Sequence, residues 1–272
     1  MRTNRAVAGL VFLLVQAWSL PRVTAQETAP AEQPASAKIW VGRAQEFEEY
    51  LRNAEIVKME ELSVGVTRPS RAWFAPGGLF ESMAWKGIKP GRYSGHWESY
   101  KSEIASYEFD KILEMNMIPP TVEKRVKGEL GAAVMWVSPI KSFTEMGGPP
   151  SPPPVHMNAW NKQLVRAKML DNLINNRDPN LGNWLVDPSW NLILIDHTRA
   201  FEAGKNPVHD LTRVDRELWE RFKTLTEEGL QAALGQWVDK RAIRGVLERR
   251  ERMQADIDKL VAAKGEAAIF LP

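Results

Sequence analysis

Apolar residues recur at helical spacing in four stretches of this chain. In residues 97–115, Ile104, Phe109 and Ile112 fall on one side of a helix and polar residues occupy the other. Pro119 and Pro120 then end that helix, because proline cannot continue the backbone hydrogen bonds. The same kind of spacing predicts three more helices, over residues 40–60, 159–175 and 210–264.

Short extended stretches lie between these helices, and turn-forming residues bound them. The sequence Ala75-Pro76-Gly77-Gly78, for example, predicts a turn between two strands. The predicted strands cover residues 62–68, 71–74 and 79–88, a hairpin of 121–127 with 132–137, and a second hairpin of 184–186 with 192–195.

A proline-rich stretch separates the part dominated by strands from the part dominated by helices. Residues 149–154 read PPSPPP and follow two glycines, which is typical of a stiff, solvated connector. We therefore predict an α+β protein, with a β-rich part over residues 38–138, a connector over 139–158 and a mostly helical part over 159–272.

The first residues have the pattern of a secretory signal peptide. Two arginines precede an apolar run from Ala6 to Val15, and Val23-Thr24-Ala25 has the small-x-small pattern of a cleavage site. We predict a signal peptide over 1–25, a disordered polar tether over 26–37, and a secreted or periplasmic mature protein. A membrane anchor is the alternative, but neither this run nor any later one reaches the roughly 20 apolar residues of a transmembrane span.

Composition limits the chemistry that is open to the chain. Its 36 Lys and Arg nearly balance its 34 Asp and Glu, so the net charge gives no basis for a nucleic-acid partner. The absence of cysteine excludes disulfides, zinc-thiolate sites, iron–sulfur clusters and thiol nucleophiles. With only four histidines, the chemistry must depend on carboxylates, amides, lysines and hydroxyls.

The richest group of candidate residues lies around the second predicted hairpin. Asp178 and Asn183 lie five residues apart in a loop before it, and Asp196 follows its last strand. Phosphoryl transfer requires such a set: one carboxylate to orient the nucleophile, and an amide and a second carboxylate to hold Mg²⁺ or Mn²⁺. Asp and Asn are also ordinary turn residues, which is the alternative for the first two. A carboxylate at the end of an apolar strand requires a partner, and this favours a site.

Upstream residues add candidates for binding a nucleotide. Ala84 and Lys86 share one face of a predicted strand, where the small residue leaves room for a flat base and the lysine can reach phosphates. Glu103 lies on the next helix, where it could pair with Lys86 or bind metal. Gly65 lies in a segment that could fold over phosphates, and Trp136 completes the set of nucleotide-binding candidates.

Three segments resemble atypical kinases. Residues 102–113 and 118–122, SEIASYEFDKIL and IPPTV, closely resemble a segment of the secretory-pathway Golgi casein kinase and four-jointed group. Residues 176–183, NRDPNLGN, resemble the N-x-DRH-x-x-N loop of HipA-type and phosphatidylinositol 3-/4-kinase-like proteins. Residues 195–201, IDHTRAF, resemble the metal-binding segment of the first group. The similarity covers about residues 60–203, and Pro179 and Asn180 replace its Arg-His pair.

The resemblance implies a bilobal protein-kinase-like fold, with a β-rich N-lobe, a short helical C-lobe and ATP between them. Lys86 would hold the α- and β-phosphates, Glu103 would pair with it or help to bind metal, and Asp178 would be the catalytic aspartate. Asn183 and Asp196 would bind Mg²⁺ or Mn²⁺. Two functions remain open: an exported phosphotransferase acting on a protein, glycan or small-molecule hydroxyl, or a pseudokinase that senses nucleotide or binds proteins.

Overall fold

A computed structural model of the chain describes residues 36–62 and 69–271, which belong to one unit spanning Pro34–Pro272. The predicted signal peptide, most of the predicted tether, Gly65 and nearly all of the predicted strand 62–68 lie outside the described residues. Ala37, the last residue of the predicted tether, is buried, and its backbone N–H donates to Asp187 Oδ2 at 2.8 Å.

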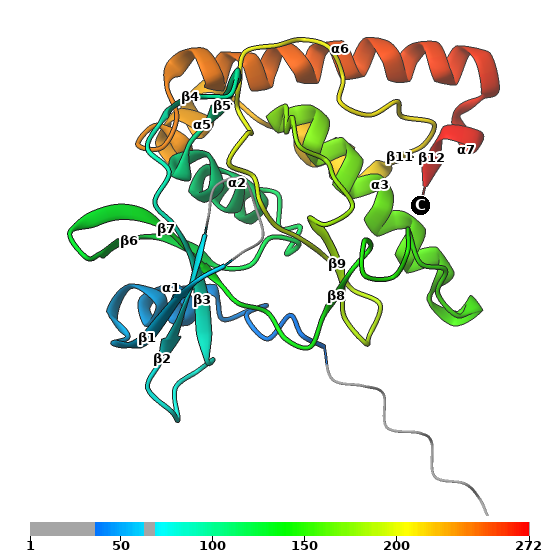
Figure 1. Cartoon of the computed structure of the whole chain (residues 1–272). Helices are drawn as coiled ribbons and strands as arrows, with labels where there is room; N and C mark the ends of the chain where they lie inside the picture. The colour runs from blue at the N-terminus through cyan, green and yellow to red at the C-terminus, as the bar shows by residue number, and fades with distance from the viewer. Residues whose placement is uncertain (1–35, 63–68, 272) are drawn as a thin grey trace, which may run out of the picture. The chain divides into compact units, whose positions relative to one another are not determined.

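The N-terminal half is built on an antiparallel sheet of five strands in the order β1-β2-β3-β7-β6 (Figure 1). Its strands are β1 (Ile56–Glu61), β2 (Ser70–Phe74), β3 (Ser82–Lys86), β6 (Thr121–Val126) and β7 (Glu129–Met135). β6 and β7 form the predicted hairpin, and Lys127 and Gly128 at its turn both have positive φ, as a tight two-residue hairpin turn requires.

Cross-strand register sorts the side chains of this sheet onto two faces. Arg71 lies opposite Ala84, and Ala84 lies opposite Val134, so these three side chains share one face. Lys86 is two residues beyond Ala84 on the same face. Ala72 and Met83 lie on the other face, in a core with helix α1 (Ala44–Asn53). The strand pattern therefore directs Lys86 away from the α1 core.

The helix predicted over 40–60 is wrong in its second half. α1 ends at Asn53, Ala54 is extended, and β1 follows in pairing with β2. The β-branched residues Ile56 and Val57 open β1, and such side chains favour a pleated strand over a helix. Pairing with β2 decides the outcome, and periodicity alone does not carry that information.

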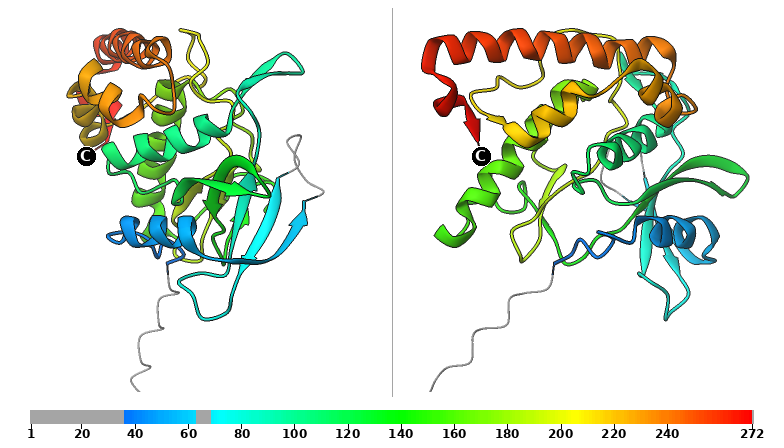
Figure 2. Two further views of the ribbon diagram at one scale, coloured as in Figure 1. Left: turned by 90° about the vertical axis from the view of Figure 1, so that its left-hand side faces the viewer. Right: turned by 180° about the vertical axis from the view of Figure 1, so that it is seen from behind.

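The second predicted helix is shorter than expected, and a small hairpin precedes it. β4 (Gly91–Tyr93) pairs with β5 (His96–Glu98), and Ser99 then caps α2 (Tyr100–Ile112) by accepting the Lys101 backbone N–H. α2 packs against β6 and β7 on one side and helix α5 on the other. Both views in Figure 2 show α2 between the sheet and the C-terminal helices.

The C-terminal half begins with β8 (Lys141–Ser142), the short 3-10 helix η1 (Pro154–His156) and α3 (Met157–Ile174). The second predicted hairpin is present as β9 (Trp184–Val186) and β10 (Leu192–Leu194), and β8 pairs with β9. Alternate residues of this hairpin enter different cores. Leu185 and Ile193 join the sheet core, whereas Trp184 and Leu192 join the helical core.

The predicted helix over 210–264 is three helices. They are α4 (Arg216–Lys223), α5 (Glu227–Leu234) and α6 (Lys240–Lys264), and β11 (Val214–Asp215) precedes them. Asp215, Thr226 and Asp239 each cap the helix that follows, and these caps divide a stretch that looks continuous by composition. α7 (Glu266–Ile269) and β12 (Phe270–Leu271), which pairs with β11, complete the elements. Within the described ranges, none of the helices has the length and apolar character needed to cross a membrane.

Candidate active site

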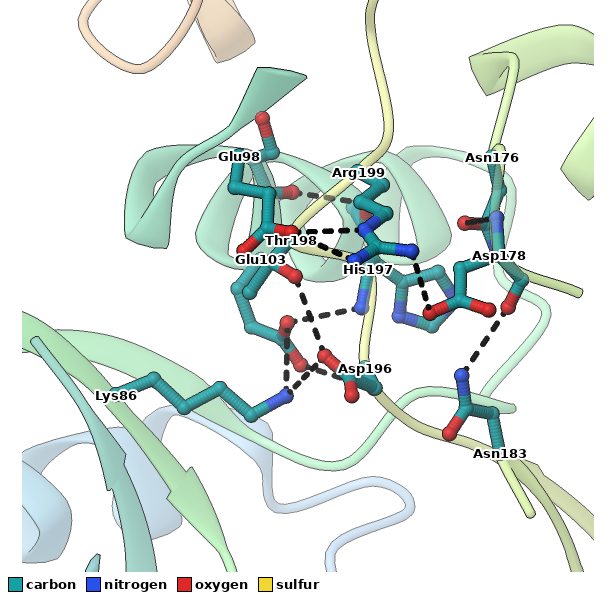
Figure 3. A network of polar contacts seen from close by, with 12 residues as sticks. Lys86, Glu98, Glu103, Asn176, Asp178, Asn183, Asp196, His197, Thr198 and Arg199 are labelled. Carbon is teal, nitrogen blue, oxygen red and sulfur yellow. Dashed lines mark hydrogen bonds and ion pairs between the residues drawn. The ribbon is translucent and has the colours of Figure 1, made fainter. Parts of the chain in front are cut away.

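Lys86 forms the centre of an ion-pair triangle in which the lysine and the glutamate are buried and the aspartate side chain is 31% exposed (Figure 3). Its Nζ lies 3.1 Å from Glu103 Oε2 and 2.9 Å from Asp196 Oδ1. The lysine comes from β3, the glutamate from the first turn of α2, and the aspartate from the loop after β10. The lysine and glutamate side chains are 8% and 1% exposed, so a charge left unpaired here would be costly.

Charge pairing sets the ionisation of this triangle. Burial by itself would lower the pKa of Lys86, but the Asp196 and Glu103 carboxylates outweigh it and hold that pKa above its ordinary value. Burial would raise the pKa of Asp196, but the Lys86 ammonium outweighs it and lowers that pKa. Lys86 and Asp196 are therefore both charged at neutral pH.

Glu103 also fixes the backbone at Asp196. Its two oxygens accept the N–H groups of Asp196 and His197 at 3.2 and 2.8 Å. Asp196 has a φ of 62°, an unfavourable value for a residue other than glycine, and these two hydrogen bonds stabilise it. Both oxygens are thus committed to protein partners, which favours pairing over metal binding for Glu103.

The loop after α3 presents Asp178 beside this triangle. Asp178 Oδ1 accepts the Asn180 side-chain amide at 3.0 Å, and the Asp178 backbone oxygen accepts Asn183 Nδ2 at 3.1 Å. The Asn183 backbone oxygen accepts the Ile195 N–H at 3.1 Å, which places the loop beside the residue that precedes Asp196. Asn176 anchors the start of the loop through Asp171.

The site has two oxygen atoms that suit a hard divalent cation. The Asn183 amide nitrogen donates to the Asp178 backbone oxygen, and Asp196 Oδ1 accepts from Lys86 Nζ. The other oxygens, Asn183 Oδ1 and Asp196 Oδ2, accept no hydrogen bond from the described residues. No cluster of three His, Cys, Asp or Glu side chains within the described ranges could hold a metal without help. One carboxylate and one amide fit Mg²⁺ or Mn²⁺ that is held jointly with nucleotide phosphates.

Trp136 stands on the same face of the sheet as Lys86, at the end of β7. The Arg71 guanidinium lies 4.2 Å from the centroid of its ring, and Arg71 is the cross-strand neighbour of Ala84. Ala84, Arg71 and Trp136 therefore lie on the sheet face that also carries Lys86. Sequence reasoning proposed two of these residues and missed Arg71, because only the strand register brings it to them.

Arg199 is a second residue that the sequence did not single out. Its Nε and Nη2 donate to Glu98 Oε1 at 2.9 and 2.7 Å, and its Nη1 lies 3.5 Å from Asp178 Oδ2. Burial would lower the pKa of Arg199, but the bonds to Glu98 outweigh it and raise that pKa. No local pattern links residues 98, 178 and 199, so only the fold could reveal this contact.

Most of the predicted site residues therefore lie together. Lys86, Glu103 and Asp196 are in direct contact, and Asp178 and Asn183 contact each other in the adjacent loop. Ala84 and Trp136 share the sheet face of Lys86, and Gly65 lies outside the described residues. His197, next to Asp196, is buried, and burial lowers its pKa and keeps its ring neutral.

Solved structures of the Golgi casein kinase, a hydra Fam20 protein and a bacterial kinase have a similar fold. The structure of the Golgi casein kinase matches with a TM-score of 0.61 and 14% identity over 84% of this chain and 78% of that one. The Fam20 protein of hydra, solved with sugar, matches with a TM-score of 0.62 and 13% identity, over 84% of this chain and 92% of that one. The Helicobacter pylori proinflammatory kinase CtkA matches with a TM-score of 0.52 and 10% identity, over 79% of this chain and 98% of that one.

A further structure of the Golgi casein kinase, with Mn/ADP bound, matches with a TM-score of 0.61 and 13% identity over the same shares of the two chains. No protein-family model and no curated protein sequence matches the chain. At these identities the similarity concerns the fold. It confirms the α+β, atypical-kinase-like fold that the sequence resemblance implied.

Proposed function

We propose that this chain is an ATP- and divalent-metal-dependent phosphotransferase that acts on a hydroxyl group of a protein, glycan or small molecule. The observation that carries this proposal is the Lys86–Glu103–Asp196 ion-pair triangle, which adjoins the loop that holds Asp178 and Asn183. The Mn/ADP bound to a kinase of similar fold supports the choice of ligands.

The residues divide the work of phosphoryl transfer between them. Lys86 would bind the α- and β-phosphates, and Glu103 would keep it in position. Asp196 Oδ2 and Asn183 Oδ1 would hold the metal ion, which when bound offsets the charge that develops on the transferred phosphoryl group. Asp178 would accept a hydrogen bond from the acceptor hydroxyl and orient it for in-line attack.

The surface formed by Ala84, Arg71 and Trp136 is suited to the base. An indole ring and a guanidinium plane both stack on nucleobases, and the small side chain of Ala84 leaves room between the strands and the base. The predicted signal peptide, residues 1–25, adds that the enzyme is exported, so it would act in a secretory or periplasmic compartment.

Transfer of labelled phosphate from ATP tests the proposal. Wild type, Asp178→Asn and Asp196→Asn are compared with Mg²⁺ or Mn²⁺, using self-labelling and a panel of protein, glycan and small-molecule acceptors. The matched control is Asp258→Asn, an exposed aspartate on α6. Removal of the catalytic carboxylate should reduce transfer by about 10² to 10⁴-fold, and the control should equal wild type.

Nucleotide affinity, measured in parallel, separates the alternatives. Asp178→Asn should retain binding of ATP with metal, and Asp196→Asn should lose its metal-dependent part. A wild type that binds ATP and metal but transfers no phosphate to any acceptor would show a pseudokinase instead. Equal transfer by wild type and both site variants would refute the site assignment.

A further inference from the structure

The loop that carries Asp178 has no basic side chain directed at this carboxylate. Pro179 and Asn180 follow Asp178 where the resembling kinases have Arg-His. Arg177 does not fill the gap. Its guanidinium lies against Gly204, where an added Cβ would come within 2.6 Å of Nη2, and it forms no ion pair with Asp178 within the described part of the chain.

Two side chains from different places in the sequence contact the two oxygens of Asp178. The Asn180 amide donates to Oδ1 at 3.0 Å, and Arg199 Nη1 lies 3.5 Å from Oδ2. The hydrogen bond to Oδ1 and the ion-pair contact with Oδ2 restrict the rotation of this carboxylate. A hydroxyl acceptor would therefore meet it in one fixed orientation, which is what general-base catalysis requires.

Glu98 in turn fixes Arg199. Glu98 Oε1 accepts both Nε and Nη2, and the Glu98 side chain is only 2% exposed. Two hydrogen bonds to one buried acceptor define the plane of the guanidinium, so the remaining nitrogen, Nη1, is directed at Asp178 (Figure 3). The Arg199 side chain itself is 18% exposed, and its reach to Asp178 therefore depends on this anchor.

The anchor, Glu98, is the last residue of β5 and lies just before the helix that carries Glu103 of the triangle. Glu98 directly precedes Ser99, the N-cap of α2, and Glu103 lies in the first turn of the same helix. The Ser99 N–H donates to the Thr198 backbone oxygen at 2.9 Å, so the helix start is bonded to the segment that carries Arg199. One end of α2 thus contacts both halves of the site.

We propose that Arg199, held by Glu98, is a positioning residue for Asp178 and supplies from the segment after Asp196 the cation that the Asp178 loop lacks. This inference rests on the proposed function. It adds that the junction of β5 and α2, through Glu98 and Glu103, positions the catalytic carboxylate and the phosphate-binding lysine together.

The test compares Arg199→Met, Arg199→Lys and Glu98→Gln with wild type. We expect Arg199→Met to lower kcat by about 10 to 100-fold, because a displaced base is poorly aligned for proton transfer, and to leave KM for ATP and the affinity for ATP with Mn²⁺ within about twofold of wild type. Arg199→Lys should retain part of kcat, since it keeps the positive charge but lacks the planar guanidinium group that binds Glu98 through two nitrogens. Added guanidinium should partly restore Arg199→Met.

A double variant distinguishes positioning from a general structural role. If Arg199 acts through Asp178, then Arg199→Met should cause no further loss of kcat in the Asp178→Asn background. The control is Arg252→Met, which removes an exposed arginine paired with Asp256 and should leave kcat unchanged. If Arg199→Met does not fold, Glu98→Gln carries the test, because it keeps the shape of the anchor and weakens its hold.

Three results would overturn the inference. The first is an unchanged kcat in Arg199→Met or, where that variant does not fold, in Glu98→Gln. The second is a fall in ATP affinity as large as the fall in kcat. The third is a loss of kcat in the double variant that equals the sum of the two single losses in free energy. Each of these leaves the proposed function standing. A wild type without any turnover would instead refute the proposed function, and the inference would fall with it.

Discussion

At the scale of single residues, the site depends on charges that are buried together. Lys86 is surrounded by two carboxylates, and neither the lysine nor Glu103 has appreciable contact with solvent. Removing one partner leaves the others unpaired in a poorly solvated place, which costs more than the pair itself contributes. A substitution of Lys86 should therefore affect stability as well as the proposed function.

We predict that Lys86→Met lowers the free energy of unfolding by about 3 kcal/mol, because Glu103 and Asp196 then face each other without a cation. Lys89→Met, which removes a lysine of an exposed pair with Glu129, should cost less than about 1 kcal/mol. Denaturant unfolding of both variants measures the difference. Equal losses would show that the triangle contributes no more than a surface pair.

The pH dependence of that loss follows from the directions of the pKa shifts. The raised pKa of Lys86 means that its stabilisation is complete below its ordinary value of about 10.4 and is lost as the pH rises through the raised pKa. The lowered pKa of Asp196 means that its stabilisation is complete above about 3.9 and is lost as the pH falls through the lowered pKa. The gap between wild type and Lys86→Met should thus stay constant between about pH 7 and 9.

A substitution of Trp136 tests the proposed nucleobase-stacking surface separately from the phosphate-binding residues. We predict that Trp136→Ala weakens ATP binding by roughly 1–3 kcal/mol, about 5 to 150-fold, because the base loses its stacking partner. Binding of inorganic triphosphate with Mn²⁺ should change less than twofold, since it contacts Lys86 and not the indole. Calorimetric titration with both ligands compares them, and equal weakening of the two would place Trp136 outside the base site.

At the scale of elements, the start of α2 and the end of β5 before it supply two glutamates of the candidate site. The N-cap residue of α2, Ser99, bonds the Lys101 N–H, and the two glutamates that contact the lysine and the arginine flank this cap. The cap matters because the first turn of a helix frays when its N–H groups have no acceptor. Fraying here would move Glu98 and Glu103 together.

We predict that Ser99→Ala lowers stability by about 1 kcal/mol and also reduces phosphate transfer, and that Ser99→Asp restores both. Thr226→Ala removes the corresponding cap of α5, where the side chain accepts the Gly229 N–H, and it should cost similar stability without loss of transfer. Unfolding and transfer assays on the same preparations decide the question. Equal loss of transfer in both alanine variants would mean that stability alone controls activity.

The sequence predicted most elements by type and fewer by extent. The hairpins β6–β7 and β9–β10 are where their alternating residues and turns place them. The helix predicted over 40–60 gave way to β1 because strand pairing outweighs a weak helical period. The long C-terminal helix divides where Asp215, Thr226 and Asp239 cap its parts, a signal that was present in the sequence.

At the scale of the whole molecule, the described residues form a sheet core, a helical core and a smaller cluster of α2 and β7 side chains. The hairpin β9–β10 contributes side chains to the sheet core and the helical core, and α2 contributes Phe109 to the helical core while packing on the sheet. The site residues come from the seam between these cores. Ligand binding at this seam should therefore change the local stability of elements in both cores.

We predict that ADP with Mn²⁺ slows amide hydrogen exchange in β3, in residues 176–183 and in residues 195–199, because the ligand would contact all three. The second half of α6, residues 254–264, serves as an internal control and should exchange as before. Removal of the metal with EDTA should abolish protection of residues 195–199 first. Protection confined to β3 would show that nucleotide binds the sheet without completing the site.

The sequence by itself determined which residue types could act and in what order they occur. Lys86, Glu103, Asp178, Asn183 and Asp196 stood out because oxygen and ammonium groups suit a metal-nucleotide site and because their order resembles that of known kinases. The similarity of the fold to solved kinase structures confirms the architecture that this order implied. The roles of these residues stay predictions until the transfer assays are made.

Only the tertiary structure decided which residues meet across long separations. Arg199 reaches Asp178 because Glu98, 101 residues earlier, fixes its guanidinium, and Arg71 joins Trp136 because β2 and β7 flank β3 in the sheet. Contacts of this kind depend on packing and strand register, and neither has a local pattern. The sequence thus indicates which residue types could act, and the fold determines which side chains contact and orient them.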